Sequence, residues 1–341
     1  MKAFLYAGLT AGILVTPACS TLQPVAGSTV GSAVDDSRSF APIRDNIPAL
    51  NIPTASERQA QDAVDATRYY PAQAMWSDEP EFTPAAEGYV RGDGASLWYQ
   101  DSGGAGVPIV LLHASTGSGA SWRHQQAYFS QKGYRVIVYS RRGHFRSTVD
   151  SPAAQASDTA DLLAVARHLQ LPAFHLLGTA AGGFTAMDFA LRHPDQLRSL
   201  IIASSLGGVD TPEFVAATAR LLVPEFLALP SHIKELGPAY RALNPGGTQR
   251  WIALEELARQ GVPRRPTMEN RIDERALRRL QPPTLFLTGG ADLYVPPALF
   301  ALLRPHVRNA SYAVIAEAGH AAAWEQPAAF NSAVLSFIAQ H

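Results

Sequence analysis

The stretch Gly178–Gly183, which reads GTAAGG, joins an apolar run at Phe174–Gly178 to a helical pattern at Gly183–Arg192. Small residues stand on both sides of Ala180. A tight turn between a strand and a helix needs small residues, because bulkier side chains would clash with the closely approaching backbone. The stretch therefore predicts a strand–turn–helix unit with Ala180 at the apex of the turn.

Short apolar runs of the same kind recur along the chain and alternate with helical patterns. The other strand candidates are Pro108–His113, Arg135–Tyr139, Ser199–Ser204, Thr284–Thr288 and Tyr312–Ala316. Their continuous apolar character suits strands that are covered on both faces. A second helix is expected at Asp158–Leu169, with Ser157 as its N-cap. We therefore predict an α/β fold with a doubly wound, mostly parallel sheet.

The segment between Ser205 and Pro283 breaks this alternation, because it holds several helical patterns and no convincing strand. It is long for a crossover connection. We expect a helical cap insertion at about 210–280, over the carboxyl edge of the sheet. Its apolar residues either line a pocket or pack the cap onto the core; they are Phe214, Leu221, Leu222, Phe226, Tyr240, Trp251 and Leu254.

The amino-terminal region differs from the rest of the chain. Residues 1–18 carry one charge, at Lys2, and an apolar run, which is typical of a signal peptide and predicts export. Cys19, the single cysteine, stands where bacterial lipoprotein signals place the acylated cysteine, so a lipid anchor and a periplasmic or outer-membrane location are expected. Plain secretion after Ala18 is the alternative. Residues 19–84 are interpreted as a tether, and 85–341 as the folded domain.

The balance of charged residues indicates which classes of ligand the protein is expected to bind. The 341 residues include 28 basic and 29 acidic side chains, a formal net charge of -1, which argues against nucleic acid or an anionic membrane surface as partner. A small-molecule substrate or ligand is the expectation. No metal-ligand cluster, phosphate loop or dinucleotide fingerprint is seen in the sequence, so neither a metal nor a cofactor is predicted.

The turn at Gly178–Gly183 resembles the nucleophile elbow Gly-x-Ser-x-Gly of the α/β-hydrolase superfamily, with Ala180 in place of the serine. Five other stretches resemble motifs of the same family, in its order and beside the expected elements. They are His113–Gly117 for the oxyanion loop, Arg141–Ser147, Gly289–Asp292 for the acid, Ala318–His320 for the histidine, and Trp324–Pro327. The resemblance covers about residues 88–341.

The resemblance implies a site in which Asp292 is the acid, His320 the histidine and Ala180 the position of the lost nucleophile. A methyl group cannot attack a carbonyl, so an acyl-enzyme at Ala180 is impossible, whether alanine is the natural residue or replaces a serine. His320, oriented by Asp292, could still act as a base. Backbone N–H groups of Ser115 and Ala181 are expected to form the oxyanion hole.

Ser115 is expected to face the same cavity as His320, as a displaced nucleophile, a hydrogen-bond donor to substrate, or a loop cap. Three hypotheses follow. The first is an enzyme acting on a small, largely apolar carbonyl compound (ester, lactone, β-dicarbonyl or phenolic) through the His–Asp dyad, as a hydrolase or a cofactor-free lyase or oxygenase. The second is an esterase with Ser115 as nucleophile. The third is a ligand-binding protein without catalysis. We favour the first, because His320 and Asp292 are intact.

Overall fold

A computed structural model describes residues 78–150, 157–259 and 267–341. The predicted signal peptide, Cys19 and nearly all of the predicted tether therefore lie outside the described residues. Within the described ranges, no helix is both long and apolar enough to cross a membrane.

The described residues contain one nine-stranded sheet in the order β1-β2-β4-β3-β6-β7-β8-β9, with β5 paired to β2. The strands are β1 (Ala86–Gly92), β2 (Ala95–Asp101), β3 (Pro108–Leu112), β4 (Arg135–Tyr139), β5 (Thr148–Val149), β6 (Phe174–Thr179), β7 (Leu197–Ala203), β8 (Thr284–Gly289) and β9 (Ala310–Ile315). From β4 to β9 in this order all pairs are parallel, whereas the pairs made by β2 with β1, β4 and β5 are antiparallel. The predicted doubly wound, mostly parallel sheet is confirmed.

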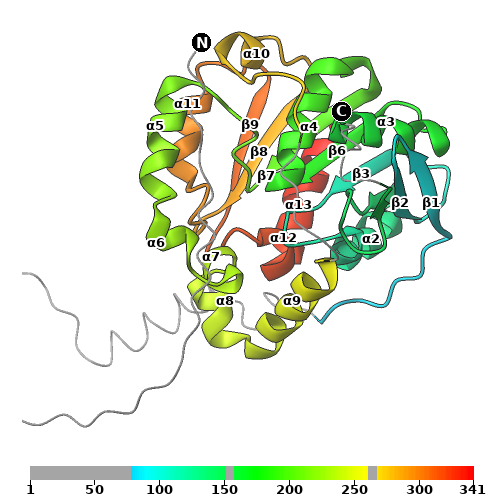
Figure 1. The fold of residues 1–341 in the computed structure, drawn as a ribbon, viewed down its shortest axis with the longest axis horizontal. Helices are drawn as coiled ribbons and strands as arrows, with labels where there is room; N and C mark the ends of the chain where they lie inside the picture. Colours follow the sequence, from blue (N-terminus) through cyan, green and yellow to red (C-terminus); the bar gives the residue numbers. More distant parts are fainter. Residues whose placement is uncertain (1–77, 151–156, 260–266) are drawn as a thin grey trace, which may run out of the picture. The chain divides into compact units, whose positions relative to one another are not determined.

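Helices cover both faces of this sheet (Figure 1). The helices α3 (Asp158–His168) and α4 (Ala181–Arg192) pack on one face, and α2 (Arg123–Gln131) and α13 (Pro327–Ile338) on the other. Alternate residues of β3 enter the two cores: Val110 and Leu112 join the first, and Ile109 and Leu111 the second. Both faces are buried, which explains why the strands are continuously apolar in sequence.

The segment between β7 and β8 is helical, as expected. Its helices are α5 (Pro212–Leu221), α6 (Pro224–Leu227), α7 (Ser231–Glu235), α8 (Pro238–Leu243), α9 (Pro245–Ala258) and α10 (Glu274–Arg278). The two ends of the insertion meet, because Val209 forms a bridge with Ile272 and the Asp210 N–H donates to the Ile272 carbonyl at 2.9 Å. Leu236, Tyr240 and Trp251 form a small core inside the cap. The chain therefore enters the cap and leaves it at one place.

Short helical turns complete the described structure. They are η1 (Gly119–Trp122), η2 (Pro194–Gln196), η3 (Pro297–Leu299), α11 (Phe300–Leu303) and α12 (Ala322–Glu325). The predicted N-cap of α3 is confirmed, because the Ser157 hydroxyl accepts from the Ala160 N–H.

Candidate active site

The turn between β6 and α4 has the sharp geometry that its sequence predicts. Ala180 lies at φ 46° and ψ −113°, a region that a non-glycine residue rarely adopts. The flanking glycines are required by contact: a Cβ on Gly178 would lie 2.4 Å from the Gly182 carbonyl oxygen, and one on Gly182 would lie 2.3 Å from that of Leu112. The turn therefore keeps the strained elbow geometry although its apex carries only a methyl group.

Neighbouring strands hold this turn in place. The Ala180 N–H donates to the Ala203 carbonyl at 3.1 Å, and the Ser205 hydroxyl donates to the Ala180 carbonyl at 2.5 Å. Ser205 also accepts from the Gly207 N–H at 3.0 Å. The apex is thus tied to the end of β7, and its backbone is fixed by hydrogen bonds that do not involve its own side chain.

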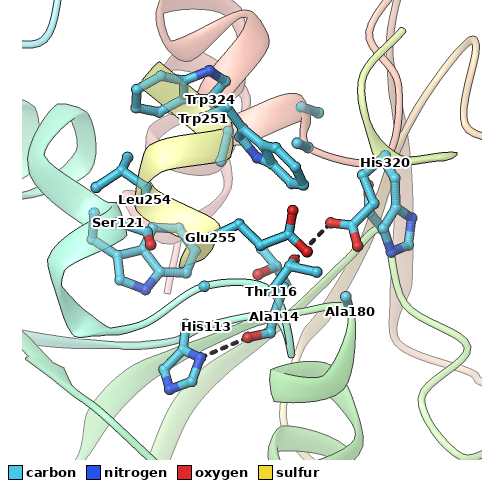
Figure 2. A pocket seen from close by; sticks show the side chains of 18 of the residues that line it. His113, Ala114, Thr116, Ser121, Ala180, Trp251, Leu254, Glu255, His320 and Trp324 are labelled. Carbon is cyan, nitrogen blue, oxygen red and sulfur yellow. Dashed lines mark hydrogen bonds between the residues drawn. The ribbon is translucent and has the colours of Figure 1, made fainter. Parts of the chain in front are cut away.

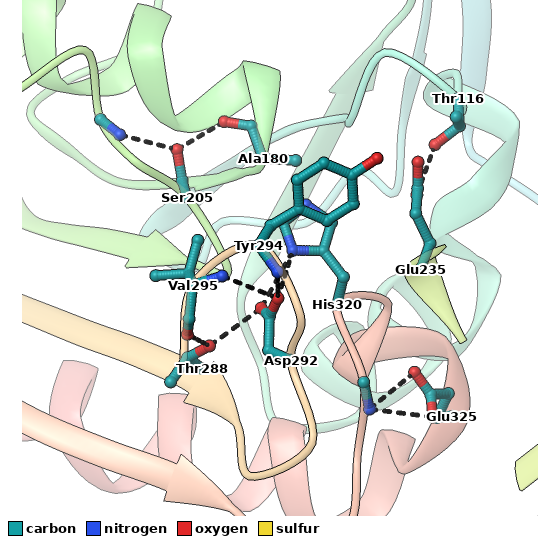
Figure 3. A network of polar contacts seen from close by, with 12 residues as sticks. Thr116, Ala180, Ser205, Glu235, Thr288, Asp292, Tyr294, Val295, His320 and Glu325 are labelled. Atoms are coloured by element: carbon teal, nitrogen blue, oxygen red, sulfur yellow. Dashed lines mark hydrogen bonds and ion pairs between the residues drawn. The ribbon is translucent and has the colours of Figure 1, made fainter. Parts of the chain in front are cut away.

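The predicted acid and histidine lie together at the ends of β8 and β9. His320 Nδ1 is 2.9 Å from both carboxylate oxygens of Asp292 (Figure 3). The carboxylate also accepts from the Thr288 hydroxyl at 2.9 Å and from the backbone N–H groups of Tyr294 and Val295 at 2.8 and 2.9 Å. These contacts fix the carboxylate, which in turn sets the orientation of the imidazole ring, and no hydrogen bond among the described residues engages Nε2, the nitrogen available for proton transfer.

The environment tunes both groups of this dyad. Burial alone would raise the pKa of Asp292, but the charge and hydrogen bond of His320 and the two backbone N–H groups hold it below its ordinary value. Burial acts to lower the pKa of His320, but the charge and hydrogen bond of Asp292, together with the nearby Glu235 and Glu325, raise the pKa above its ordinary value. The dyad is therefore a carboxylate beside an imidazole whose basicity is enhanced.

Two further residues shape the histidine loop. The Tyr294 ring packs on the imidazole of His320 with centroids 4.4 Å apart. The Glu325 carboxylate accepts from the Gly319 N–H at 3.0 Å and from the Gly237 N–H of the cap at 2.9 Å, while burial raises its pKa to about 7. Glu325 thus ties the residue before His320 to the start of α8.

A cavity lies above Ala180 and joins the elbow, the histidine loop and the cap. Figure 2 shows Trp251 and Trp324 on one side of it and Ala114 and Ala180 on the other. Its wall contains the aromatic side chains Trp122, Trp251, Trp324 and Phe330, and the polar or charged side chains His113, Thr116, Ser121, Thr179, Ser204, Glu235, Glu255 and His320. Of the apolar cap residues singled out from sequence, Trp251 and Leu254 line this cavity, whereas Phe214 and Tyr240 are buried in packing. In the described ranges, no three His, Cys, Asp or Glu side chains are grouped as a metal site.

The expectation that Ser115 faces the cavity is wrong. Ser115 is exposed and is not part of the cavity wall, where Ala114 and Thr116 lie instead. The Gly117 N–H donates to the Ala114 carbonyl at 3.1 Å and closes a turn that has Ser115 at its outer corner. His144 Nε2 lies 3.3 Å from the Ser115 carbonyl and supports this conformation. The side chain of Ser115 is therefore not presented to His320.

His113 in the same loop is a structural residue. Its Nε2 accepts from the Arg141 N–H at 2.9 Å, so its Nδ1 carries the proton and donates to the Ala114 carbonyl at 2.6 Å. Burial lowers its pKa well below the ordinary value. The ring is thus a neutral imidazole that joins two loops, with no nitrogen left for chemistry.

Two buried carboxyl groups of the cap were missed by the sequence analysis. Glu235 ends α7 and accepts from the Thr116 hydroxyl at 2.8 Å, and Glu255 lies on α9. Both line the cavity, and both are less than a tenth exposed. Burial raises the pKa of Glu235, although His320 and the Thr116 hydroxyl act to lower it. An acidic residue on a cap helix is usually solvated, so sequence gave no signal that these two face inward.

Comparison with known proteins agrees with the fold and the order of the motifs. Residues 109–333 match the model of the alpha/beta hydrolase family. The chain is 29% identical to 3-oxoadipate enol-lactonase 2 of Acinetobacter baylyi, covering 70% of this chain and 91% of that protein. It is 26% identical to 2-hydroxy-6-oxononadienedioate/2-hydroxy-6-oxononatrienedioate hydrolase of Paraburkholderia xenovorans, covering 73% and 93%.

Among solved structures, the chain is similar to an N-acyl homoserine lactone degrading enzyme, with a TM-score of 0.60, 28% identity, and coverage of 73% of this chain and 99% of that one. These relatives are enzymes that act on small molecules, and two of them are named for lactones. The strained turn at Ala180, the Asp292–His320 pair and the match over 109–333 lead to one conclusion: the chain belongs to the α/β-hydrolase family.

Proposed function

We propose that the protein is a hydrolase of small, largely apolar carbonyl compounds, esters or lactones above all, that works without a nucleophile at the elbow. The observation that carries the proposal is the position of His320, which contacts Asp292 at 2.9 Å and shares one cavity with Ala180. The aromatic wall of that cavity suits an apolar substrate. Relatives named for enol-lactone and acyl homoserine lactone substrates support the substrate class.

In this reaction His320 acts as a general base on water. Nε2 takes a proton from water while the water oxygen forms a bond to the substrate carbonyl carbon. The carbonyl oxygen gains negative charge, which the backbone N–H groups of Ala181 and Ser115 would stabilise. The bond to the leaving oxygen then breaks, and the protonated imidazole returns its proton to that oxygen. The products are a carboxylic acid and an alcohol, or one hydroxy acid from a lactone.

The methyl group of Ala180 leaves space for the attacking water where a serine hydroxyl would otherwise stand. Asp292 stabilises the imidazolium that forms in the first step, because its carboxylate is held below its ordinary pKa by the contacts described above. Serine proteases that lose a member of their triad still accelerate hydrolysis by about 10³–10⁴-fold over water through the oxyanion hole and binding. Rate enhancement of that size is therefore within reach of this site.

The test is a screen of purified protein against esters, lactones, β-diketones and phenolic acids, with His320→Ala beside the wild type. We expect turnover that His320→Ala lowers by roughly 10²–10⁴-fold, the usual contribution of a positioned base. His168→Ala, a change at an exposed histidine of α3, is the matched control and should keep the wild-type rate. Equal rates in wild type and His320→Ala would refute the proposal.

The missing hydroxyl at Ala180 also favours a second candidate, a protein that binds a small carbonyl compound without converting it. This candidate predicts a ligand whose affinity is unchanged in Asp292→Asn and from which no product forms. Product formation at the same site excludes it.

Export, with a lipid anchor at Cys19, is also part of our proposal, and it is supported by the sequence of residues 1–19. Expression of the full chain in a bacterium with labelled palmitate should give a labelled protein in the membrane fraction. Cys19→Ser should abolish the label, and a wild-type protein without label would contradict lipid anchoring while leaving secretion after Ala18 open.

A further inference from the structure

The cavity above Ala180 carries charge of one sign on its cap side. Glu235 of α7 and Glu255 of α9 line it, and among the described residues no lysine or arginine belongs to its wall. The positive charge that His320 can carry is already balanced by Asp292, whose oxygens are 2.9 Å from its Nδ1. A bound molecule would therefore meet two cap carboxyl groups inside the cavity, and the ion-pair partner of Glu255, Arg259, lies outside it.

Each carboxylate keeps one oxygen for a ligand. The Thr116 hydroxyl donates to Glu235 Oε2, and Arg259 forms an ion pair with Glu255 Oε1. The hydrogen bonds found among the described residues leave Glu235 Oε1 and Glu255 Oε2 without a donor. The Arg259 side chain is 53% exposed and is not part of the cavity wall, so it approaches Glu255 from outside.

The rest of the wall also fits a bound organic cation. Trp122, Trp251 and Trp324 line the cavity, and the face of an indole ring attracts cations. Ser204, directly after β7 and beside the elbow, lines the same cavity and is 2% exposed, and its hydroxyl has no hydrogen-bond partner within the described ranges. A buried hydroxyl without a partner costs free energy, which a polar group of a ligand would recover.

We propose that the substrates of this site carry a positively charged nitrogen, as in esters or lactones of amino acids or amino alcohols. The ammonium group lies between Glu235 and Glu255 against the tryptophan rings, and the carbonyl group lies over Ala180 beside His320. The placement of the carbonyl group beside His320 rests on the proposed function. The relative named for oxononadienedioate takes a dianion by its name, whereas this cavity would repel one.

Binding of three small aromatic probes tests the charge preference without any need for turnover. Benzylamine is a cation at pH 8, benzyl alcohol is neutral, and benzoate is an anion, and all three are of similar size. Calorimetry should show benzylamine bound at least about 10-fold more tightly than benzyl alcohol, a difference of about 1.4 kcal/mol, and benzoate most weakly. Equal affinities for benzylamine and benzyl alcohol, or a preference for benzoate, would overturn the inference.

Three variants locate the preference. Glu235→Gln and Glu255→Gln should each bring the affinity for benzylamine close to that for benzyl alcohol, whereas Glu256→Gln, a change at the exposed neighbour on α9, should leave it as in the wild type. Circular dichroism checks that each variant is folded. If Glu235→Gln does not fold, the affinities measured with Glu255→Gln show whether the cation preference depends on the cap carboxylates. A cation preference that survives in Glu255→Gln would place the cation elsewhere and overturn the inference.

The two proposals fail separately. His320→Ala should still prefer benzylamine although it no longer hydrolyses substrate. Hydrolysis that depends on His320, with no preference among the three probes, would overturn the cation site alone. A cation preference without hydrolysis of any ester or lactone would overturn the proposed function alone.

Discussion

The two halves of the catalytic geometry differ in what they have kept. At the β8 and β9 ends, both functional groups are present, and Asp292 holds His320 while accepting three further hydrogen bonds. At the β6 end, the functional group is absent but the backbone remains strained, with Ala180 at φ 46°. The difference shows that the hydroxyl of an elbow and the shape of an elbow have separate physical origins.

The shape of the turn comes from close backbone packing. A Cβ on Gly182 or Gly183 would lie 2.3 Å from the Leu112 carbonyl oxygen or from the Ser205 hydroxyl oxygen. The helix therefore starts almost in contact with the strands beside it, and the residue at the apex must turn sharply whatever its side chain. None of these contacts involves the side chain at the apex, so the strained turn does not depend on a serine hydroxyl there.

This comparison predicts that Ala180→Ser restores a working nucleophile, the largest effect we expect. The new hydroxyl would stand at a preformed elbow in the cavity that His320 lines. A fluorophosphonate probe should label Ala180→Ser stoichiometrically and the wild type not at all. Ester hydrolysis should rise by at least roughly 10³-fold, because removing the nucleophile of a serine triad lowers kcat by about 2 × 10⁶-fold. Labelling of the wild type at Ser115 would show that the exposed loop moves inward and that the site has a nucleophile outside the elbow.

Asp292→Asn tests the acid–histidine pair, and its effect on the rate of hydrolysis should be smaller than that of Ala180→Ser. The amide cannot balance an imidazolium, and its N–H group can force the wrong tautomer on His320. We expect the wild-type rate to fall by roughly 10²-fold with little change in KM. Asp195→Asn, a change in the short turn η2 on the surface, is the control. An unchanged rate would mean that the acid–histidine pair has no part in turnover.

The pH dependence of the rate gives a finer test of the same pair. Asp292 raises the pKa of His320 above its ordinary value of 6.5, and a general base must be unprotonated to act. The kcat/KM of the wild type should therefore fall as the pH drops through a value above 6.5. In Asp292→Asn, the negative charge that raises the pKa of His320 is removed while burial still lowers it. The fall in kcat/KM should therefore move to lower pH. A fall that stays at the same pH in both proteins would assign it to another group.

Most of the fold could be predicted from sequence because its signals are local. Apolar runs such as Arg135–Tyr139 and the glycines around Ala180 report on their own backbone, and β4 and the elbow lie where these patterns predict. The pair Asp292 and His320 was predicted from motifs that resemble those of the family. Each residue follows the end of a strand, β8 or β9, and these two strands are neighbours in the sheet, so the two side chains come close together.

The rest of the site depends on how distant segments pack, which no local pattern reports. Ser115 was placed in the cavity because it follows His113, but the turn at Ala114–Gly117 directs it outward. Glu235 and Glu255 lie inward only because the cap helices α7 and α9 fold over the elbow. Glu235 and Glu255 lie on two different helices, and nothing in the sequence around either distinguishes it from a solvent-exposed glutamate. The acidic wall of the cavity therefore could not be predicted.

The smallest effect concerns the origin of the elbow shape. Where a helix has room for the added methyl group, replacing glycine by alanine usually stabilises, by about 0.5–1 kcal/mol in a helix interior and by less at the second residue, the position of both Gly182 in α4 and Gly246 in α9. Gly182→Ala should instead destabilise the protein by about 1–3 kcal/mol, because its Cβ would meet the Leu112 carbonyl, part of a central strand that cannot move aside. Gly246→Ala, on α9, is the matched control, since the nearest atom is the flexible Arg250 side chain at 3.6 Å. Urea unfolding should separate the two variants in opposite directions. If Gly182→Ala were as stable as Gly246→Ala, close packing would not be what holds Ala180 in its strained conformation, and the elbow would need another explanation.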